Sequence, residues 1–143
     1  IVSTIQSIVF LIIAYFYGIQ LELLGYILVI PVILFTSIIL NAFALFISSV
    51  IKQLENFASV MNFVIFPMFF LSSALYPLWK IKDSSVFMYE VCLFNPFTYI
   101  VEFIRFTLYL KFDYSNFFIL LLTFVIVLSA AFMGYNTKNV LKK

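Results

Sequence analysis

The stretch that decides the fold is Asn95-Pro96-Phe97-Thr98-Tyr99-Ile100-Val101-Glu102-Phe103-Ile104-Arg105. It closes an interval, beginning at Leu75, in which prolines and charged side chains are mixed with Leu, Phe and Tyr, whereas the chain on either side is almost uniformly apolar. Such an interval is neither a clean membrane span nor a soluble loop. Backbone that leaves the helical form inside a bilayer needs protein or water around it, because hydrocarbon offers no hydrogen bonds. We therefore expect this interval to lie at the bilayer surface or to dip back into it.

The composition excludes an ordinary soluble domain. Of the 143 residues, 66% are hydrophobic and only 10% are charged, whereas soluble domains carry about 25% charged residues. A chain of this size cannot enclose so much apolar surface in a core. We therefore predict an all-α integral membrane protein. The sequence has no His and a single cysteine, Cys92, which excludes a Cys/His metal site within it, and no cofactor is expected.

The long apolar blocks predict about four transmembrane helices, near residues 1–18, 23–50, 57–76 and 117–135. The second block is longer than the hydrocarbon core is thick, so its helix must tilt, kink or protrude. Pro31 and Pro67 are the candidate kinks, because proline removes a backbone donor. Asn41 and Asn62 are candidates for the translocation path or for helix packing. Hydrogen bonding between helices is the commoner role for such residues.

Residues 77–112 predict an outer, broken or re-entrant helical hairpin before the last span. Pro77 is expected to end the third span, and two helical pieces should follow, broken at Asn95-Pro96. Glu102 and Arg105 are three residues apart, so on a helix they share a face and can pair. A charge deep in the bilayer costs at least about 2.5–3.5 kcal/mol. A shallow re-entrant hairpin therefore fits better than two full crossings.

The distribution of lysines predicts the orientation. With four spans, the loop after residue 50 and the C-terminal tail fall on the same side, and together they set four lysines against one glutamate: Lys52, Lys138, Lys142 and Lys143 against Glu55. The charges of the 77–116 segment balance. The positive-inside rule then makes the loop and tail cytoplasmic and places the hairpin on the outer face.

The order of these pieces resembles the membrane subunit of ABC-2 type exporters, the permeases of ATP-driven efflux systems. The resemblance covers residues from about Leu23 to the end, and its pieces are a Ser-Ser-Val-Ile-Lys turn, an aromatic span with an internal proline, Leu71-Ser72-Ser73-Ala74-Leu75-Tyr76-Pro77-Leu78, Asn95-Pro96-Phe97-Thr98-Tyr99, an acidic residue, Arg105 and a last span with a basic tail. Residues 53–58 and 61–70 are similar to permeases found with quinoprotein alcohol-oxidation systems.

The resemblance implies that the chain is the C-terminal part of a six-span permease in a bacterial inner membrane, with the coupling helix upstream. It implies a homodimer or two permease chains, surrounded by lipid and docked on ATP-binding subunits. This chain has no Gly-x-x-x-x-Gly-Lys-Ser/Thr motif for nucleotide phosphates, so the ATPase would be a separate chain. Lys52 and Glu55 are the candidate cytoplasmic contact with it, and no nucleic acid partner is expected.

The implied mechanism gives the hairpin a role. ATP binding would rock two permease halves, and the hairpin would act as a lid at the exit, its angle fixed by Asn95, Pro96, Glu102 and Arg105. The alternative for the ion pair is that it only solvates a surface helix, since exposed pairs contribute about 0–1 kcal/mol. With few charges inside the bilayer, the chain suits an amphipathic or hydrophobic cargo.

Two other functions are compatible with a membrane chain of this composition. One is a membrane enzyme acting on lipids. The active sites of such enzymes usually need a His, a carboxylate pair or a metal cluster, and this sequence contains no recognisable nucleophile–base pair. The other is a scaffold subunit that transports nothing. Co-purification with an ATPase distinguishes the exporter from both.

Overall fold

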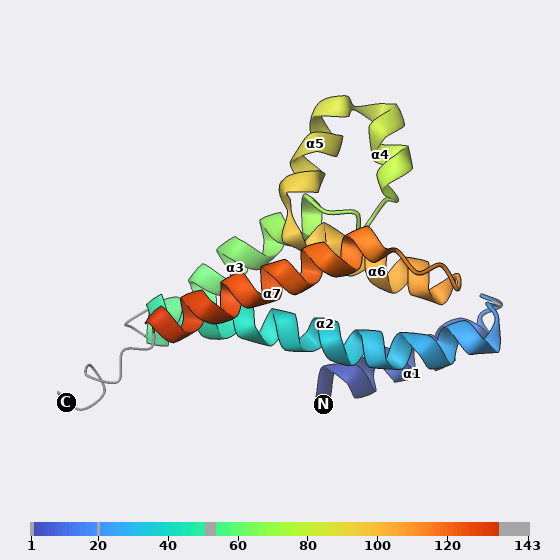
Figure 1. The fold of residues 1–143 in the computed structure, drawn as a ribbon, viewed down its shortest axis with the longest axis horizontal. Helices are drawn as coiled ribbons and strands as arrows, with labels where there is room; N and C mark the ends of the chain where they lie inside the picture. The colour runs from blue at the N-terminus through green and yellow to red at the C-terminus, as the bar shows by residue number, and fades with distance from the viewer. Residues whose placement is uncertain (1, 20, 51–53, 135–143) are drawn as a thin grey trace.

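Seven α-helices form the regular structure of the described residues, which are 2–19, 21–50 and 54–134 of a computed structural model. No strand occurs among these residues, so the prediction of an all-α protein is confirmed. The helices, labelled in Figure 1, are α1 (Val2–Phe16), α2 (Leu23–Val50), α3 (Leu54–Phe70), α4 (Leu78–Ser84), α5 (Val86–Phe94), α6 (Pro96–Leu108) and α7 (Tyr114–Gly134).

The packed centre of the molecule is where α2, α6 and α7 meet. Each of these three helices packs against the other two, and Figure 1 shows α2 and α7 running side by side along the long axis. Their shared core is a cluster of buried apolar side chains: Ile39, Ile100, Phe103 and Leu120. Phe35 and Phe117 pack ring to ring beside it, with centroids 6.0 Å apart. A buried apolar core between three helices holds α6 against the two longest ones.

The helices α2 and α7 run in the same direction. Ser48 and Ser49, at the C-terminal end of α2, line one small cavity together with Ala131 and Phe132, near the C-terminal end of α7. The C-terminal ends of these two helices therefore lie at the same end of the molecule. Lys52 and residues 135–143 themselves lie outside the described residues.

Two helices of the described chain are long and apolar enough to cross a membrane, over Leu23–Ser49 and Tyr114–Met133. A third crossing is possible if α5 and α6 count as one broken span, since these helices meet at 93°. The other two predicted spans fall on the shorter apolar helices Thr4–Phe16 and Ala58–Phe70. The structure thus has the helical architecture of a membrane protein, with two or three spans by length and composition.

The third predicted span ends earlier than expected. We expected a helix to Tyr76, stopped by Pro77, but α3 ends at Phe70 and Pro77 instead precedes α4. The carbonyl of Leu71 accepts a hydrogen bond from the side chain of Asn95, and the hydroxyl of Ser72 turns back onto the carbonyl of Phe69 at 2.6 Å. Side chains therefore satisfy carbonyls that the helix end leaves without an intrahelical partner, and the helix can stop here.

The predicted hairpin contains three helices where the sequence indicated two pieces. The additional helix α4 begins directly after Pro77, and Ser85 joins it to α5 by accepting a hydrogen bond from the backbone N–H of Met88 at 3.4 Å. Figure 1 shows α4 and α5 joined end to end as an arch that rises away from the layer of α2, α3, α6 and α7. We call this pair the α4–α5 arm. It carries four exposed charged side chains: Lys80, Lys82, Asp83 and Glu90.

The C-terminal end of α6 reaches the beginning of α2 at Gly25. A Cβ added to Gly25 would collide with the carbonyl oxygen of Leu108. The absence of a side chain at Gly25 therefore permits the backbones of α2 and α6 to approach closely, which is a common use of small residues between membrane helices.

Candidate functional site

Asn95 stands at the joint between α5, α6 and the end of α3. Its side-chain amide nitrogen donates to the carbonyl oxygens of Met68 at 2.6 Å and Leu71 at 2.8 Å. Its side-chain oxygen accepts from the backbone N–H of Phe97 at 3.0 Å, which caps the start of α6. Its own backbone N–H closes the end of α5 on the carbonyl of Cys92. One asparagine therefore satisfies backbone groups at the ends of three helices.

Pro96 fixes the direction in which α6 leaves this joint. It is the first residue of α6, a position where no backbone N–H is needed and where the fixed φ of proline suits the helix. The residue before a proline is pushed to extended backbone, and Asn95 has φ −84° and ψ 116°. These two constraints account for the sharp bend between α5 and α6, which the sequence predicted at this dipeptide.

Glu102 and Arg105 form the predicted ion pair. Nη1 of Arg105 donates to Oε1 of Glu102 at 2.6 Å, and the side chains are 27% and 7% exposed respectively. Nη2 of the same guanidinium donates to the carbonyl oxygen of Ser73 at 2.8 Å. The pair is therefore not a solvated surface feature, because its carboxylate is buried and its guanidinium is tied to another segment. It fixes α6 to the connection between α3 and α4.

A polar seam lies along the same face of α6. Thr98, Glu102 and Arg105 follow one another at spacings of four and three, so they lie on one side of the helix. Thr98 and Ser73 are fully buried, and among the described residues neither hydroxyl has a hydrogen-bond partner. The sequence interpretation did not single out these two residues as site residues. Their signal was the presence of small polar side chains within otherwise apolar runs.

Asn41 and Asn62 take no part in the hydrogen bonds of the joint. The amide of Asn41 donates to the carbonyl of Ser37 on its own helix at 2.7 Å. This bond therefore lies within one helix, whereas a hydrogen bond between two helices had been expected. Both asparagine side chains are exposed. The helices α2 and α3 continue without interruption through Pro31 and Pro67. Of the predicted cytoplasmic contact, Lys52 and the side chain of Glu55 lie outside what the structure describes.

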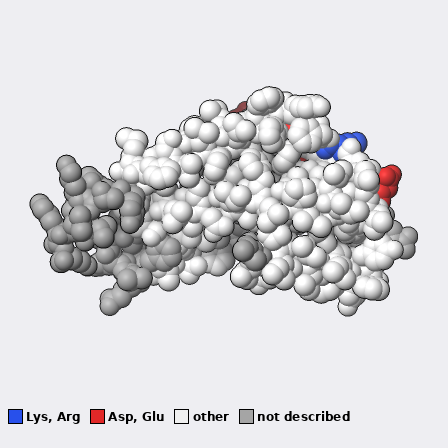
Figure 2. Space-filling model, turned by 60° about the horizontal axis from the view of Figure 1, so that its bottom comes forward, with Lys and Arg blue, Asp and Glu red and all other residues white. Residues whose placement is uncertain are grey.

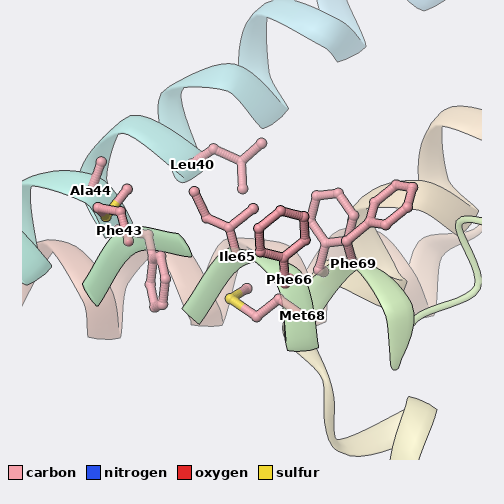
Figure 3. Close-up of a pocket in the computed structure, with 9 residues that line it drawn as sticks. Leu40, Phe43, Ala44, Ile65, Phe66, Met68 and Phe69 are labelled. Carbon is pink, nitrogen blue, oxygen red and sulfur yellow. The ribbon is translucent and has the colours of Figure 1, made fainter. Parts of the chain in front are cut away.

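An apolar cavity of about 310 Å³ lies beside the joint. Its walls come from α2, α3 and the first turn of α6, and Figure 3 shows the rings of Phe66 and Phe69 beside Leu40 and Ile65. All the residues that line it are apolar: Leu40, Phe43, Ala44, Met61, Ile65, Phe66, Met68, Phe69 and Phe97. The sequence interpretation took the phenylalanines of α3 for packing, but Phe66 and Phe69 line this cavity.

Charged side chains are few on the surface of the bundle. Figure 2 shows a face that is almost entirely uncharged, with the visible Lys, Arg, Asp and Glu atoms gathered mainly towards one end. That end is the one where α6 ends and α1 connects to α2 (Figure 1). An uncharged flank with charges at its end is the distribution expected of a helix bundle in a bilayer.

These features define an integral membrane protein of the helical class, with a buried ion pair and a bent helix pair before its last helix. A family model described as ABC-2 type transporter matches residues 1–109, which is most of the chain and extends through α6. The chain therefore belongs to the ABC-2 type transporter family, whose members are membrane transport subunits. Searches of curated proteins and of solved structures found no match.

Proposed function

We propose that the chain is the membrane permease subunit of an ABC-2 type exporter, driven by ATP hydrolysis in a separate subunit. The observation that carries the proposal is the family match over residues 1–109. It includes the whole of the hairpin helices α4, α5 and α6.

In this proposal the hairpin is the part of the permease that moves during transport. Because Asn95 bonds to Met68 and Leu71 while it also caps α6, a displacement of α3 carries the start of α6 with it. The bond from Arg105 to Ser73 couples α6 to the same connection at a second point. On ATP binding, α3 and α6 would shift together and turn the α4–α5 arm, which acts as a lid on the outer side.

The exposed charges of the α4–α5 arm support the proposal that the permease is a dimer. The arm leaves the side of the bundle (Figure 1) and exposes Lys80, Lys82, Asp83 and Glu90. Placing each of these charged side chains in hydrocarbon at the centre of the bilayer would cost at least about 2.5–3.5 kcal/mol. The side from which the arm projects therefore faces water or protein, and we propose a homodimer with the two arms at the exit of the path.

The apolar cavity supports a hydrophobic or amphipathic cargo. Its wholly apolar lining, between Leu40 on α2 and Phe97 on α6, suits a hydrocarbon portion and offers nothing to a small ion. We place the protein in a bacterial inner membrane. In the proposed orientation the C-terminal ends of α2 and α7, and the C-terminus of the chain, face the cytoplasm. Lys52 and Glu55 would then lie on the side of the ATP-binding subunit.

Purification of the full-length tagged protein in mild detergent tests the proposal. We expect a stoichiometric ATP-binding subunit to co-purify, and its ATP hydrolysis to rise when the two are reconstituted together. If a preparation keeps its lipids and its own subunits together yet contains no ATPase, the permease has no subunit to drive transport. That result would contradict the exporter proposal and favour the enzyme or scaffold function. In the intact complex, normal export by a Glu102→Gln variant at normal protein level would refute the role of the ion pair in the lid.

A further inference from the structure

Another cavity, of about 420 Å³, lies where the start of α4 meets the end of α6. Unlike the apolar cavity, it combines three aromatic rings with three charged side chains: Trp79, Phe106, Tyr109, Glu102, Arg105 and Lys111. We propose that this cavity binds the phosphate group of an anionic membrane amphiphile, whose headgroup, unlike that of phosphatidylcholine, carries no cation beside the phosphate. Neither the family match nor the proposed transport assigns a ligand to it.

The charges in the cavity favour an anion. Glu102 is neutralised by Arg105 across a 2.6 Å contact, so Lys111 leaves the lining with an excess of one positive charge. The guanidinium has five N–H donors, and the bonds to Glu102 and to Ser73 use two of them. The remaining donors are available to a ligand in the planar arrangement that binds phosphate oxygens well. Asp113, close by in sequence, accepts hydrogen bonds from the backbone at the start of α7 and does not line the cavity.

The backbone at the end of α6 brings Lys111 and Tyr109 to the cavity. Leu110 has φ 57°, in the left-handed region that is unfavourable for a non-glycine residue. The N–H of Leu110 bonds to the carbonyl of Thr107 and the N–H of Lys111 to the carbonyl of Phe106, which is a Schellman ending of the helix. These bonds occupy carbonyls that would otherwise repel an anion. A strained residue therefore sits between two residues of the cavity wall.

The aromatic rings place the cavity at the depth of lipid headgroups. Trp79 is 67% and Tyr109 61% exposed, and such amphipathic rings prefer the interface between hydrocarbon and water. Phe106 supplies an apolar wall beside the charged groups. A ligand with a phosphate next to an apolar portion matches this combination, whereas a free inorganic anion would leave the rings unused.

The fluorescence of Trp79 gives a direct test, because it is the single tryptophan of the 143 residues and lines the cavity. The full-length protein, with any tryptophan outside these residues changed to phenylalanine, is placed in nanodiscs containing brominated phosphatidylglycerol or brominated phosphatidylcholine. Bromine on the acyl chains quenches a nearby indole. We expect about five-fold stronger apparent binding of the anionic lipid, the size of effect that one basic residue near a membrane surface exerts.

Matched variants separate this site from general attraction to the membrane. Lys111→Gln should abolish the preference for phosphatidylglycerol and Lys111→Arg should keep it. Lys82→Gln should also keep it, because that side chain lies over the ring of Tyr89 on the arm and does not line the cavity. Equal quenching by the two lipids, or a preference unchanged by Lys111→Gln, overturns the proposal.

A soluble competitor distinguishes the two sources of the phosphate. If glycerol 3-phosphate relieves the Lys111-dependent quenching at millimolar concentration, the site recognises the phosphate group itself. If only the lipid competes, the site recognises the headgroup together with the apolar portion. Both results support a phosphate site. The measurement needs no ATPase, so failure to find an ATP-binding partner would leave this inference intact, and the converse also holds.

Discussion

The side-chain amide of Asn95 donates to the carbonyl oxygen of Met68 at 2.6 Å, across 27 residues of sequence. This bond joins the C-terminal end of α3 to the N-terminal end of α6. The same side chain caps α6 through its oxygen, so the two helices share one residue as their junction. Two helix ends that share a side chain must move together or lose these hydrogen bonds, which are part-buried or exposed.

Asn95→Ser separates the two functions of this residue. Serine keeps an oxygen that can cap α6, but its side chain is too short to reach the carbonyls of Met68 and Leu71. We expect the free energy of unfolding to fall by about 0.5–1.5 kcal/mol for each hydrogen bond lost, the ordinary net value, because one of these bonds is part-buried and the other is exposed. Asn95→Ala should lose about 1 kcal/mol more, because the cap is then removed as well. Unfolding in SDS titrations followed by circular dichroism measures both values.

Asn62→Ser is the control for this pair of variants. It makes the same chemical change at an exposed position on α3, where substitutions usually change the free energy of unfolding by less than about 0.5 kcal/mol. If Asn95→Ser is no more destabilising than Asn62→Ser, the bonds to α3 do not hold the two helices together.

Arg105→Met should destabilise the protein more than Glu102→Gln. Methionine leaves the carboxylate of Glu102, only 7% exposed, buried without its cation, and also removes the donor to Ser73. Breaking a buried pair in this way costs about 3–5 kcal/mol. Glutamine at residue 102 still offers an oxygen to Arg105, so its cost should be smaller.

The double variant tests whether the pair acts as a unit. With Glu102→Gln added to Arg105→Met no buried charge remains unpaired, so we expect part of the lost stability to return. Thermal unfolding of the four proteins in the same detergent completes the cycle. Purely additive losses would contradict a buried pair and favour the solvated-surface alternative.

The sequence was sufficient for those features that depend on neighbouring residues. The bend at Asn95-Pro96 follows from the preferences of proline and of the residue before it, and the pairing of Glu102 with Arg105 follows from helical spacing. The early end of α3 could not be predicted, because Asn95, 24 residues beyond Leu71, takes its carbonyl. The same holds for Ser73, whose carbonyl meets a guanidinium 32 residues away. Local patterns do not record such distant partners.

Gly25→Ala should destabilise the protein, although alanine is the better helix former. In an isolated helix this change is favourable by about 1 kcal/mol. Here the new Cβ would meet the carbonyl oxygen of Leu108, and forcing two packed segments apart costs typically about 1–3 kcal/mol. The sign of the change in melting temperature decides the matter. A rise would mean that α2 and α6 do not approach at this point.

Ala44→Phe should obstruct the apolar cavity. Ala44 lies in its wall on α2, and a benzyl group directed inward would occupy space that a hydrophobic cargo needs. In the reconstituted complex, we expect the concentration of a hydrophobic compound that half-stimulates ATP hydrolysis to rise about ten-fold, equivalent to about 1.4 kcal/mol of binding. Ala58→Phe is the matched control, because Ala58 is exposed on α3 and does not line the cavity. Equal responses of the two variants would exclude this cavity from the cargo path, and the search for the path would then move to the side from which the α4–α5 arm projects.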